Sequence, residues 1–152
     1  MRAVIQRVEE ASVSVGGKVV GSCGHGFLIL LCVMESDTAN DIPVLVKKIV
    51  NLRIFSDENG KINKSLLDTG GQILLISQFT LAADCRHGNR PDFLSAAPAE
   101  KAKAYFEIFE AEIKKIVPET ETGVFGEHMH VSLVNDGPFT VILDTDNLKK
   151  RA

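Results

Sequence analysis

The run GFLILLCV, residues 26–33, decides how the rest of the chain can fold. Every position from Phe27 to Val33 is apolar, so neither face of the segment suits water. A short, continuous apolar run is typical of a strand that is buried on both faces. We therefore expect Gly26–Val33 to form a buried strand in the middle of the fold.

Strand patterns also occur on both sides of this run. Apolar and β-branched residues bounded by turn signals predict further strands at Met1–Val8, Ala11–Val15, Lys18–Ser22, Arg53–Ser56 and Gln72–Phe79. Gly16-Gly17 is a hairpin turn signal, and the segments DENG at 57–60 and TGG at 69–71 mark two further turns. The stretch Lys61–Leu67 fits neither a helix nor a strand pattern clearly.

Two segments have helical periodicity instead. Between Ile42 and Leu52 the apolar residues recur at helical spacing, with Ser36 or Asp37 as candidate cap and Pro43 tolerable only in the first turn. The second helix ends before Pro118, and Pro98 suits its first turn, with Ser95 or a neighbour as its cap. Its apolar stripe is Ala102, Tyr105, Phe106, Phe109, Ile113, Ile116 and Val117. The aromatic residues lie on this stripe, so we expect them to be helix core and not a platform for stacking bases.

The order of these elements sets the fold class. Roughly nine strands and two helices that do not alternate as β-α-β-α predict an α+β domain with mixed, barrel-like sheets. A doubly wound α/β fold is the alternative, and it would need more helices. No composition shift marks a linker, so residues 1–152 are expected to form a single domain.

Composition excludes several functional classes. The net charge of −3 argues against a protein that coats nucleic acid electrostatically. The longest apolar run, Phe27–Met34, is far shorter than the roughly 18 residues of a membrane span. The chain has three cysteines without CxxC spacing, which argues against a disulfide scaffold and against a zinc knuckle. We expect a cytoplasmic protein that does not bind membranes.

The first candidate site is SQFTL, residues 77–81, where a predicted apolar strand opens into a long loop. Sites often lie at such strand ends. Taken alone, Ser77, Gln78 and Thr80 more commonly satisfy backbone groups where a strand frays. A nucleophilic Thr80 would need a base nearby, and the motif contains none; His87 lies seven residues further on.

The second candidate is NDGPFT, residues 135–140, between the strand patterns MHVSLV and FTVIL. Pro138 has no backbone N–H to give to a sheet, and Gly137 weakens strand pairing. The pair therefore marks either a turn or a functional position.

Together, SQFTL and NDGPFT resemble the signatures of the D-aminoacyl-tRNA deacylase family, known for D-tyrosyl-tRNA deacylase activity. The resemblance covers nearly the whole chain, including MRAVIQRVEEASVSV, GFLILL, LRIFSDENGKIN, SQFTLAAD, Arg90-Pro91 and VSLVNDGPFT. Cys32 departs from it, because a glycine is expected there. We interpret that departure as a matter of local packing and not of the active site.

The resemblance implies a homodimeric editing enzyme. Its activity would be hydrolysis of the ester that joins a D-amino acid, or glycine mischarged on tRNA-Ala, to the terminal ribose of tRNA, without a cofactor. Gly137 and Pro138 would be joined by a cis bond, which costs only about 0.5–1 kcal/mol before proline. The pair would reach the SQFTL segment of the other subunit and act as a filter that rejects L-amino acids.

The resemblance also suggests roles for individual groups. The backbone N–H groups of Phe79 and Thr80 are the candidate donors to an oxyanion. Thr80 either attacks the ester, with Gln78 or Ser77 orienting it, or only positions the substrate, and we favour the second role. Arg7 is either an exposed strand residue or a buried cation that supports the Gly-Pro segment; both interpretations stay open.

The remaining polar candidates are less specific. His128 and His130 are expected on one face of a strand, but no third ligand follows at a suitable spacing, so we do not predict a metal site. Several cations could contact tRNA phosphates or simply be solvated, namely Arg86, His87, Arg90, Lys47, Lys48 and the tail Lys149–Arg151. Without the resemblance, two other functions remain: a small dimeric β-rich binding module and a nonspecific acyl esterase.

Overall fold

The computed structural model describes residues 1–149, which form eight strands, four α-helices and one short 3-10 helix. The strands are β1 (Arg2–Val15), β2 (Lys18–Cys23), β3 (Gly26–Cys32), β4 (Phe55–Ser56), β5 (Ile62–Lys64), β6 (Gln72–Ser77), β7 (Thr120–Thr122) and β8 (His130–Asp144). The helices are α1 (Asp41–Val50), α2 (Leu66–Thr69), η1 (Phe79–Ala82), α3 (Ala99–Ile116) and α4 (Thr145–Lys149).

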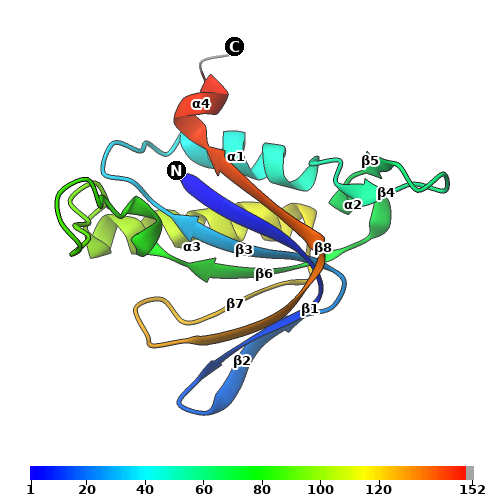
Figure 1. Ribbon diagram of the computed structural model, residues 1–152, viewed down its shortest axis with the longest axis horizontal. Helices are drawn as coiled ribbons and strands as arrows, with labels where there is room; N and C mark the ends of the chain where they lie inside the picture. Colours follow the sequence, from blue (N-terminus) through cyan, green and yellow to red (C-terminus); the bar gives the residue numbers. More distant parts are fainter. Residues whose placement is uncertain (150–152) are drawn as a thin grey trace.

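Six strands form one mixed sheet in the order β2-β1-β3-β6-β7, with β8 paired to the other side of β1 (Figure 1). The pairs β3–β6 and β6–β7 are parallel, and the others in this sheet are antiparallel. The sheet curls so far that β2 approaches β7. A Cβ atom at Gly21 would lie only 2.5 Å from the Thr122 carbonyl oxygen, and Ser22 N–H donates to the Glu121 carboxylate at 2.6 Å. The fold is therefore a nearly closed, barrel-like α+β domain, as expected.

β1 is one continuous strand, so the prediction of separate strands at Met1–Val8 and Ala11–Val15 was wrong. Its first half pairs with β3, from Arg2 to Val8, and its second half pairs with β2, from Ala11 to Val15. Glu9 and Glu10 are exposed at the point where the partner changes. These two charged residues interrupt the apolar pattern of the sequence, so one continuous strand was predicted as two.

The sheet separates two apolar cores, and β3 contributes to both. On one face, Phe27, Ile29 and Leu31 pack beneath α1 and α3. On the other face, Leu28 packs with Leu74 inside the curl of the sheet. The prediction that Gly26–Val33 is a buried strand is therefore confirmed.

The two long helices match their apolar patterns, but not their expected caps. Pro43 lies in the first turn of α1 as expected, whereas the N-cap is Asn40 and makes no side-chain cap bond. The N-cap of α3 is Pro98 and not Ser95. The side chains Ala102, Phe106, Phe109 and Ile113 are buried along α3, which confirms most of its core stripe. Tyr105 is only half-buried, and Ile116, which was expected on the stripe, is 43% exposed.

Two strand ends differ from the prediction near the candidate sites. β6 ends at Ser77, two residues early, because Phe79–Ala82 turns into η1. β8 is a single strand, and NDGPFT lies inside it instead of between two strands. The ambiguous stretch 61–67 contains β5 and the start of α2, which is capped by Ser65. Within residues 1–149, we find no helix with the length and apolar character of a membrane span.

Candidate active site

The SQFTL segment leaves the sheet as a turn at the end of β6. Gln78 N–H donates to the Leu31 carbonyl oxygen of β3 at 2.8 Å, which ties the start of the turn to the neighbouring strand. Ser77 and Gln78 are half-buried, whereas Phe79 and Thr80 are exposed. The structure therefore presents Phe79 and Thr80 at the surface, directly after a rigid strand.

The backbone N–H groups of Phe79 and Thr80 have no acceptor among residues 1–149. They are the first two N–H groups of η1, and the start of a helix leaves such donors without intrahelical partners. Two neighbouring free donors can bind the oxygen of an ester carbonyl and stabilise the negative charge that it develops. This geometry suits the role expected for Phe79 and Thr80.

The Thr80 hydroxyl lies against the Gln78 side-chain amide, which donates to it. An amide cannot take up the hydroxyl proton at neutral pH, so this partner does not make Thr80 a strong nucleophile. No carboxylate or imidazole among residues 1–149 forms a hydrogen bond with Thr80. The arrangement fits a residue that positions a substrate better than one that attacks it.

An apolar pocket of about 530 Å³ opens beside this turn. It is lined by Ser77, Gln78 and Phe79, by Phe106 of α3 and by Phe125 of the β7–β8 loop. The Phe79 ring also contacts the Phe93 ring edge-on, with 5.1 Å between centroids. A flat, apolar group could enter this pocket while a polar group attached to it stays beside the free N–H donors.

The Gly137-Pro138 pair projects from β8 as a bulge. Asn135 pairs with Val8 and Thr140 pairs with Gln6, so a single residue of β1, Arg7, lies opposite the four residues 136–139. The bond between Gly137 and Pro138 is cis, as the resemblance implied, and both residues are exposed.

Arg7 supports this bulge from below, which decides between its two interpretations. Its side chain is only 12% exposed, and its guanidinium donates to the carbonyl oxygens of Asp136 at 3.1 Å and Ile54 at 2.6 Å. The guanidinium also lies over the Phe139 ring, 5.0 Å from its centroid, and pairs with the Asp136 carboxylate. Arg7 is thus a largely buried cation that holds the bulge in place.

Asn135 closes the base of the bulge, a contact that sequence reasoning missed. Its side chain donates to the carbonyl oxygens of Arg7 and Phe139, at 2.9 and 3.0 Å, and accepts from Phe139 N–H at 3.2 Å. Asparagine next to a Gly-Pro pair was an available signal, because its amide often bonds to nearby backbone in turns.

The two candidate segments lie at opposite ends of the sheet within one chain. Arg7 pairs with Phe27, and Phe27 pairs with Ile73, whereas Thr80 follows Ser77 at the far end of β6. The four residue-to-residue steps from Ile73 to Ser77 span about 13 Å of strand, before the turn begins. Gly137 and Pro138 therefore do not meet the SQFTL segment of their own chain.

Of the other polar candidates, His128 lines the pocket beside the SQFTL turn, together with Ser77, Gln78 and Phe79. His128 precedes β8 instead of lying in it, and its ring is 5.0 Å from that of His130. Across residues 1–149, no set of three potential metal ligands is present. Lys149 pairs with Asp41, and Arg86 pairs with Asp84. The side chains of His87, Arg90, Lys47 and Lys48 are exposed, and Lys150–Arg151 lie outside the described residues.

Cys32 is nearer to the candidate site than expected. Its thiol lies 3.5 Å from the Phe79 carbonyl oxygen, directly behind the turn. The local packing of Cys32 therefore reaches the candidate site itself. A sequence cannot show this contact, because it joins residues 47 positions apart.

Comparisons with known proteins agree on one family. The family model described as D-Tyr-tRNA(Tyr) deacylase matches residues 4–144. A D-aminoacyl-tRNA deacylase of Dictyoglomus turgidum is 53% identical and covers 99% of this chain and 96% of its own length. One from Thermus aquaticus is 52% identical over 95% of each chain.

Two solved structures have the same fold. A protein described as c-Myc DNA Unwinding Element Binding Protein is 41% identical, with a TM-score of 0.90 over 95% of this chain and 98% of that one. A probable eukaryotic D-amino acid tRNA deacylase is 16% identical, with a TM-score of 0.83 over 94% and 98% of the two chains. The second likeness concerns the fold alone.

Proposed function

The chain belongs to the D-aminoacyl-tRNA deacylase family of hydrolases, and we propose that its candidate site removes D-amino acids and glycine from tRNA while it spares L-amino acids. The reaction is hydrolysis of the ester between the amino acid and the terminal ribose. The observation that carries the proposal is the pair of free N–H groups, of Phe79 and Thr80, in a turn whose residue Phe79 lines an apolar pocket. Aminoacyl-tRNA is used where translation takes place, so we assign the activity to the cytosol.

The pocket suits the terminal nucleoside of tRNA. Every tRNA ends in an adenosine, and proteins hold unpaired RNA bases by stacking them on aromatic side chains. Phe79, Phe106 and Phe125 line a space that is large enough for such a base. With the base in the pocket, the ester of the same nucleotide lies at the turn.

The chemical step then needs little from side chains. Phe79 N–H and Thr80 N–H bind the ester oxygen, and they stabilise it more strongly as its negative charge grows. Water attacks the carbonyl carbon, and the free ribose hydroxyl of the tRNA helps to activate that water. The Thr80 hydroxyl, held by Gln78, positions the substrate.

The Gly137-Pro138 bulge is the proposed chiral filter, supplied by a second copy of the chain. If backbone groups fix the amino group and the ester, an L-amino acid must direct its Cβ into this wall, whereas a D-amino acid directs it to solvent. Glycine has no Cβ and is not excluded. The exposed position of the bulge and its separation from Thr80 of the same chain support an arrangement in trans.

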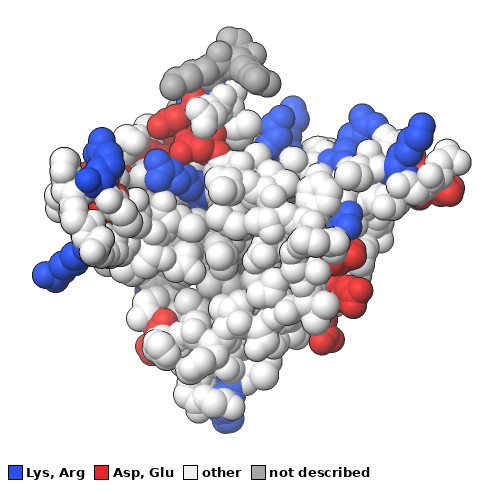
Figure 2. All heavy atoms as spheres, in the orientation of Figure 1, with Lys and Arg blue, Asp and Glu red and all other residues white. Residues whose placement is uncertain are grey.

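The surface of the sheet favours such a dimer. Figure 2 shows that charged side chains gather around the margin of one face and that its centre is largely uncharged. On β8, the apolar side chains of Val134 and Ile142 are 45% and 73% exposed, so a partner surface that covered them would bury apolar area. A symmetric dimer would bury this face and bring each bulge to the other chain's turn.

Matched substrates test the activity. The purified protein is incubated with D-tyrosyl-tRNA and L-tyrosyl-tRNA, and the ester that remains is measured over time. Cleavage of the D form alone is expected. Cleavage of both forms indicates a nonspecific esterase, and cleavage of neither indicates a binding module. Thr80→Ala then separates the mechanisms, because a near-parental single-turnover rate excludes covalent attack by Thr80.

Mixed dimers test the arrangement in trans. Thr80→Ala removes the hydroxyl from one half of the site, and Arg7→Met loosens the bulge of the other half. If both variants cleave D-tyrosyl-tRNA more slowly than the parent, they are mixed in equal amounts and allowed to exchange subunits. Half of the dimers are then mixed, and each mixed dimer carries one intact site of two. The cleavage rate should therefore rise towards about one quarter of the parental rate. No recovery in mixed dimers of proven composition would place the whole site in one chain.

A further inference from the structure

The carbonyl oxygens on the inner side of the SQFTL turn are all occupied. Gln78 O accepts from Leu81 N–H at 3.3 Å, and Thr80 O accepts from Ala83 N–H at 3.1 Å. These two bonds belong to the turn itself. The Phe79 carbonyl, which also takes part in the i→i+3 bonding of η1, and the Leu81 carbonyl are contacted by side chains from β3 and β1.

Cys32, the last residue of β3, holds the Phe79 carbonyl. Its thiol lies 3.5 Å from that oxygen, closer than to the Val33 oxygen at 3.6 Å or the Met34 sulfur at 3.7 Å. The Val33 oxygen already accepts from Ala97 N–H at 3.0 Å. Burial raises the pKa of the Cys32 thiol, so it keeps its proton and remains a donor at neutral pH.

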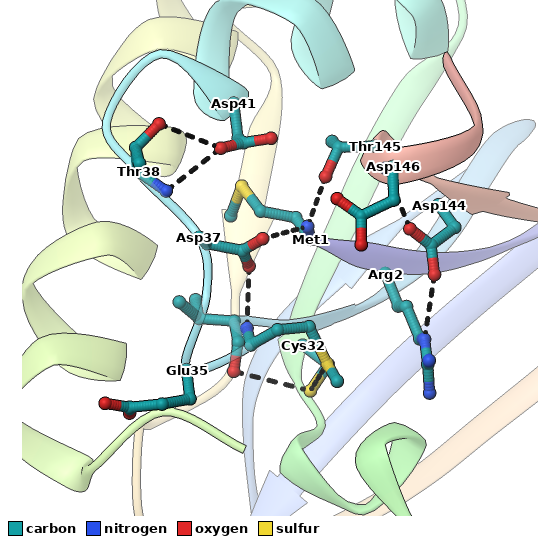
Figure 3. Close-up of polar contacts among 12 residues, drawn as sticks. Met1, Arg2, Cys32, Glu35, Asp37, Thr38, Asp41, Asp144, Thr145 and Asp146 are labelled. Carbon is teal, nitrogen blue, oxygen red and sulfur yellow. Dashed lines mark hydrogen bonds and ion pairs between the residues drawn. The ribbon is translucent and has the colours of Figure 1, made fainter. Parts of the chain in front are cut away.

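Arg2, near the start of β1, holds the Leu81 carbonyl. Its Nη1 donates to that oxygen at 3.1 Å. Its Nε donates to the Asp144 carboxylate at 2.9 Å, as Figure 3 shows. Asp144 is fixed in turn, because it accepts from Asp146 N–H at 2.9 Å. The guanidinium therefore links the end of β8 to the turn in a defined orientation.

Peptide geometry connects these contacts to the proposed reaction. A trans peptide group is planar, so the carbonyl of Phe79 and the N–H of Thr80 lie in one plane and point in opposite directions. Holding the Phe79 oxygen against buried Cys32 directs Thr80 N–H outward. Arg2 limits rotation at the other end of the same turn.

On the basis of the proposed function, we propose that Cys32 and Arg2 are positioning residues, which aim the Phe79 and Thr80 N–H groups at the ester oxygen without touching the substrate. Such residues affect the transition state more than the bound substrate. Their loss should lower the rate of the chemical step while substrate affinity stays close to parental.

Cys32→Ala tests the first contact, with Cys23→Ala as the matched control. Both thiols are buried in strands, but Cys23 lies near the Phe27 carbonyl, away from the turn. Single-turnover cleavage of D-tyrosyl-tRNA by Cys32→Ala should fall about tenfold, less than the roughly 100-fold or greater loss when an oxyanion donor is deleted. Cys32→Ser retains a donor and should recover most of the rate. Cys23→Ala should keep the parental rate.

Arg2→Met tests the second contact, with Arg53→Met as its control. Arg53 also donates to a backbone carbonyl, that of Asn63 at 2.8 Å, but on the β4–β5 hairpin. Arg2→Met should slow the chemical step with little change in affinity for a non-hydrolysable D-aminoacyl-adenosine, and Arg53→Met should not.

Parental rates in both Cys32→Ala and Arg2→Met would overturn the inference. Equal losses of rate and affinity, or no rescue by Cys32→Ser, would likewise indicate a general structural role. A parental protein that does not cleave D-tyrosyl-tRNA would instead refute the proposed function itself, so the two failures are distinguishable.

Discussion

Arg7→Met should destabilise the protein and weaken its chiral selection together. The variant removes two charged donors, from the carbonyl oxygens of Asp136 and Ile54, and a contact with the Phe139 ring. Hydrogen bonds to a charged group contribute about 1.5–3 kcal/mol each, and a cation–π contact about 0.5–1 kcal/mol. Ile54 is only 8% exposed, so water cannot easily replace the lost donor.

Several terms reduce this sum. Methionine keeps most of the apolar stem of the side chain, and the dehydration and ordering of the guanidinium are no longer needed. The Asp136 carboxylate is 36% exposed and can be rehydrated, so its ion pair contributes little. We expect a net loss of about 3 kcal/mol in the free energy of unfolding. For a chain of this size, that corresponds to a fall of roughly 6–12 °C in Tm.

Urea and thermal denaturation measure the stability, and cleavage of D- and L-tyrosyl-tRNA measures the selection. Arg53→Met, which loses an exposed arginine–carbonyl contact, should remain near parental in both assays. A loss of stability below about 1 kcal/mol would refute the energetic reasoning, since a single charged hydrogen bond should exceed it. A destabilised variant with an unchanged D-to-L ratio would refute the role of the bulge as a wall.

Three further outcomes follow from the packing and charge of the chain. Phe109 is fully buried beneath the sheet, so Phe109→Ala should cost about 3–5 kcal/mol in urea denaturation, whereas Ile108→Ala, at a 45% exposed position of the same helix, should cost far less. Burial raises the pKa of Asp41, but hydrogen bonds from Lys149 and Thr38 outweigh it and hold that pKa well below its usual range. This stabilisation is present above the ordinary aspartate pKa of about 3.9 and is lost as the pH falls, so Asp41→Asn should flatten the decline in urea midpoint below pH ~4. A net charge of −3 predicts few phosphate contacts, so affinity for deacylated tRNA should fall only shallowly with salt, and a steep decline would contradict this.

The sequence predicted the parts of the fold that depend on local periodicity. The burial of the all-apolar strand Gly26–Cys32 and of the α3 stripe follows from the spacing of apolar residues within each segment. The long strands were harder, because their interruptions have tertiary causes. Glu9 and Glu10 interrupt the pattern where β1 changes partner, and Gly137-Pro138 interrupts β8 at a bulge.

The sequence predicted the two short motifs of the candidate site, but not the residues that hold these motifs in place. SQFTL and NDGPFT indicated which residues to examine, and the role of Arg7 stayed open because its contacts lie 47 and 129 positions away. Cys32 and Arg2 were not found for the same reason, since they reach the turn only through the pairing of β1 with β3. Contacts of this kind depend on strand register, which periodicity alone does not fix.

The register of β1 gives a reason for building the proposed site from two chains. Arg2 holds the turn at one end of this strand, and Arg7 holds the bulge further along it. They are five residue-to-residue steps apart, which is about 17 Å along the strand. A strand cannot bend back to join its own two ends, but two copies related by a twofold axis run in opposite directions and can bring unlike ends together. In the proposed dimer, the turn and the bulge of each chain would be held through Arg2 and Arg7 of its own β1 instead of by flexible loops. A filter that distinguishes the two sides of one carbon atom needs such rigidity, because a displacement of about 1 Å can already change reactivity by two orders of magnitude.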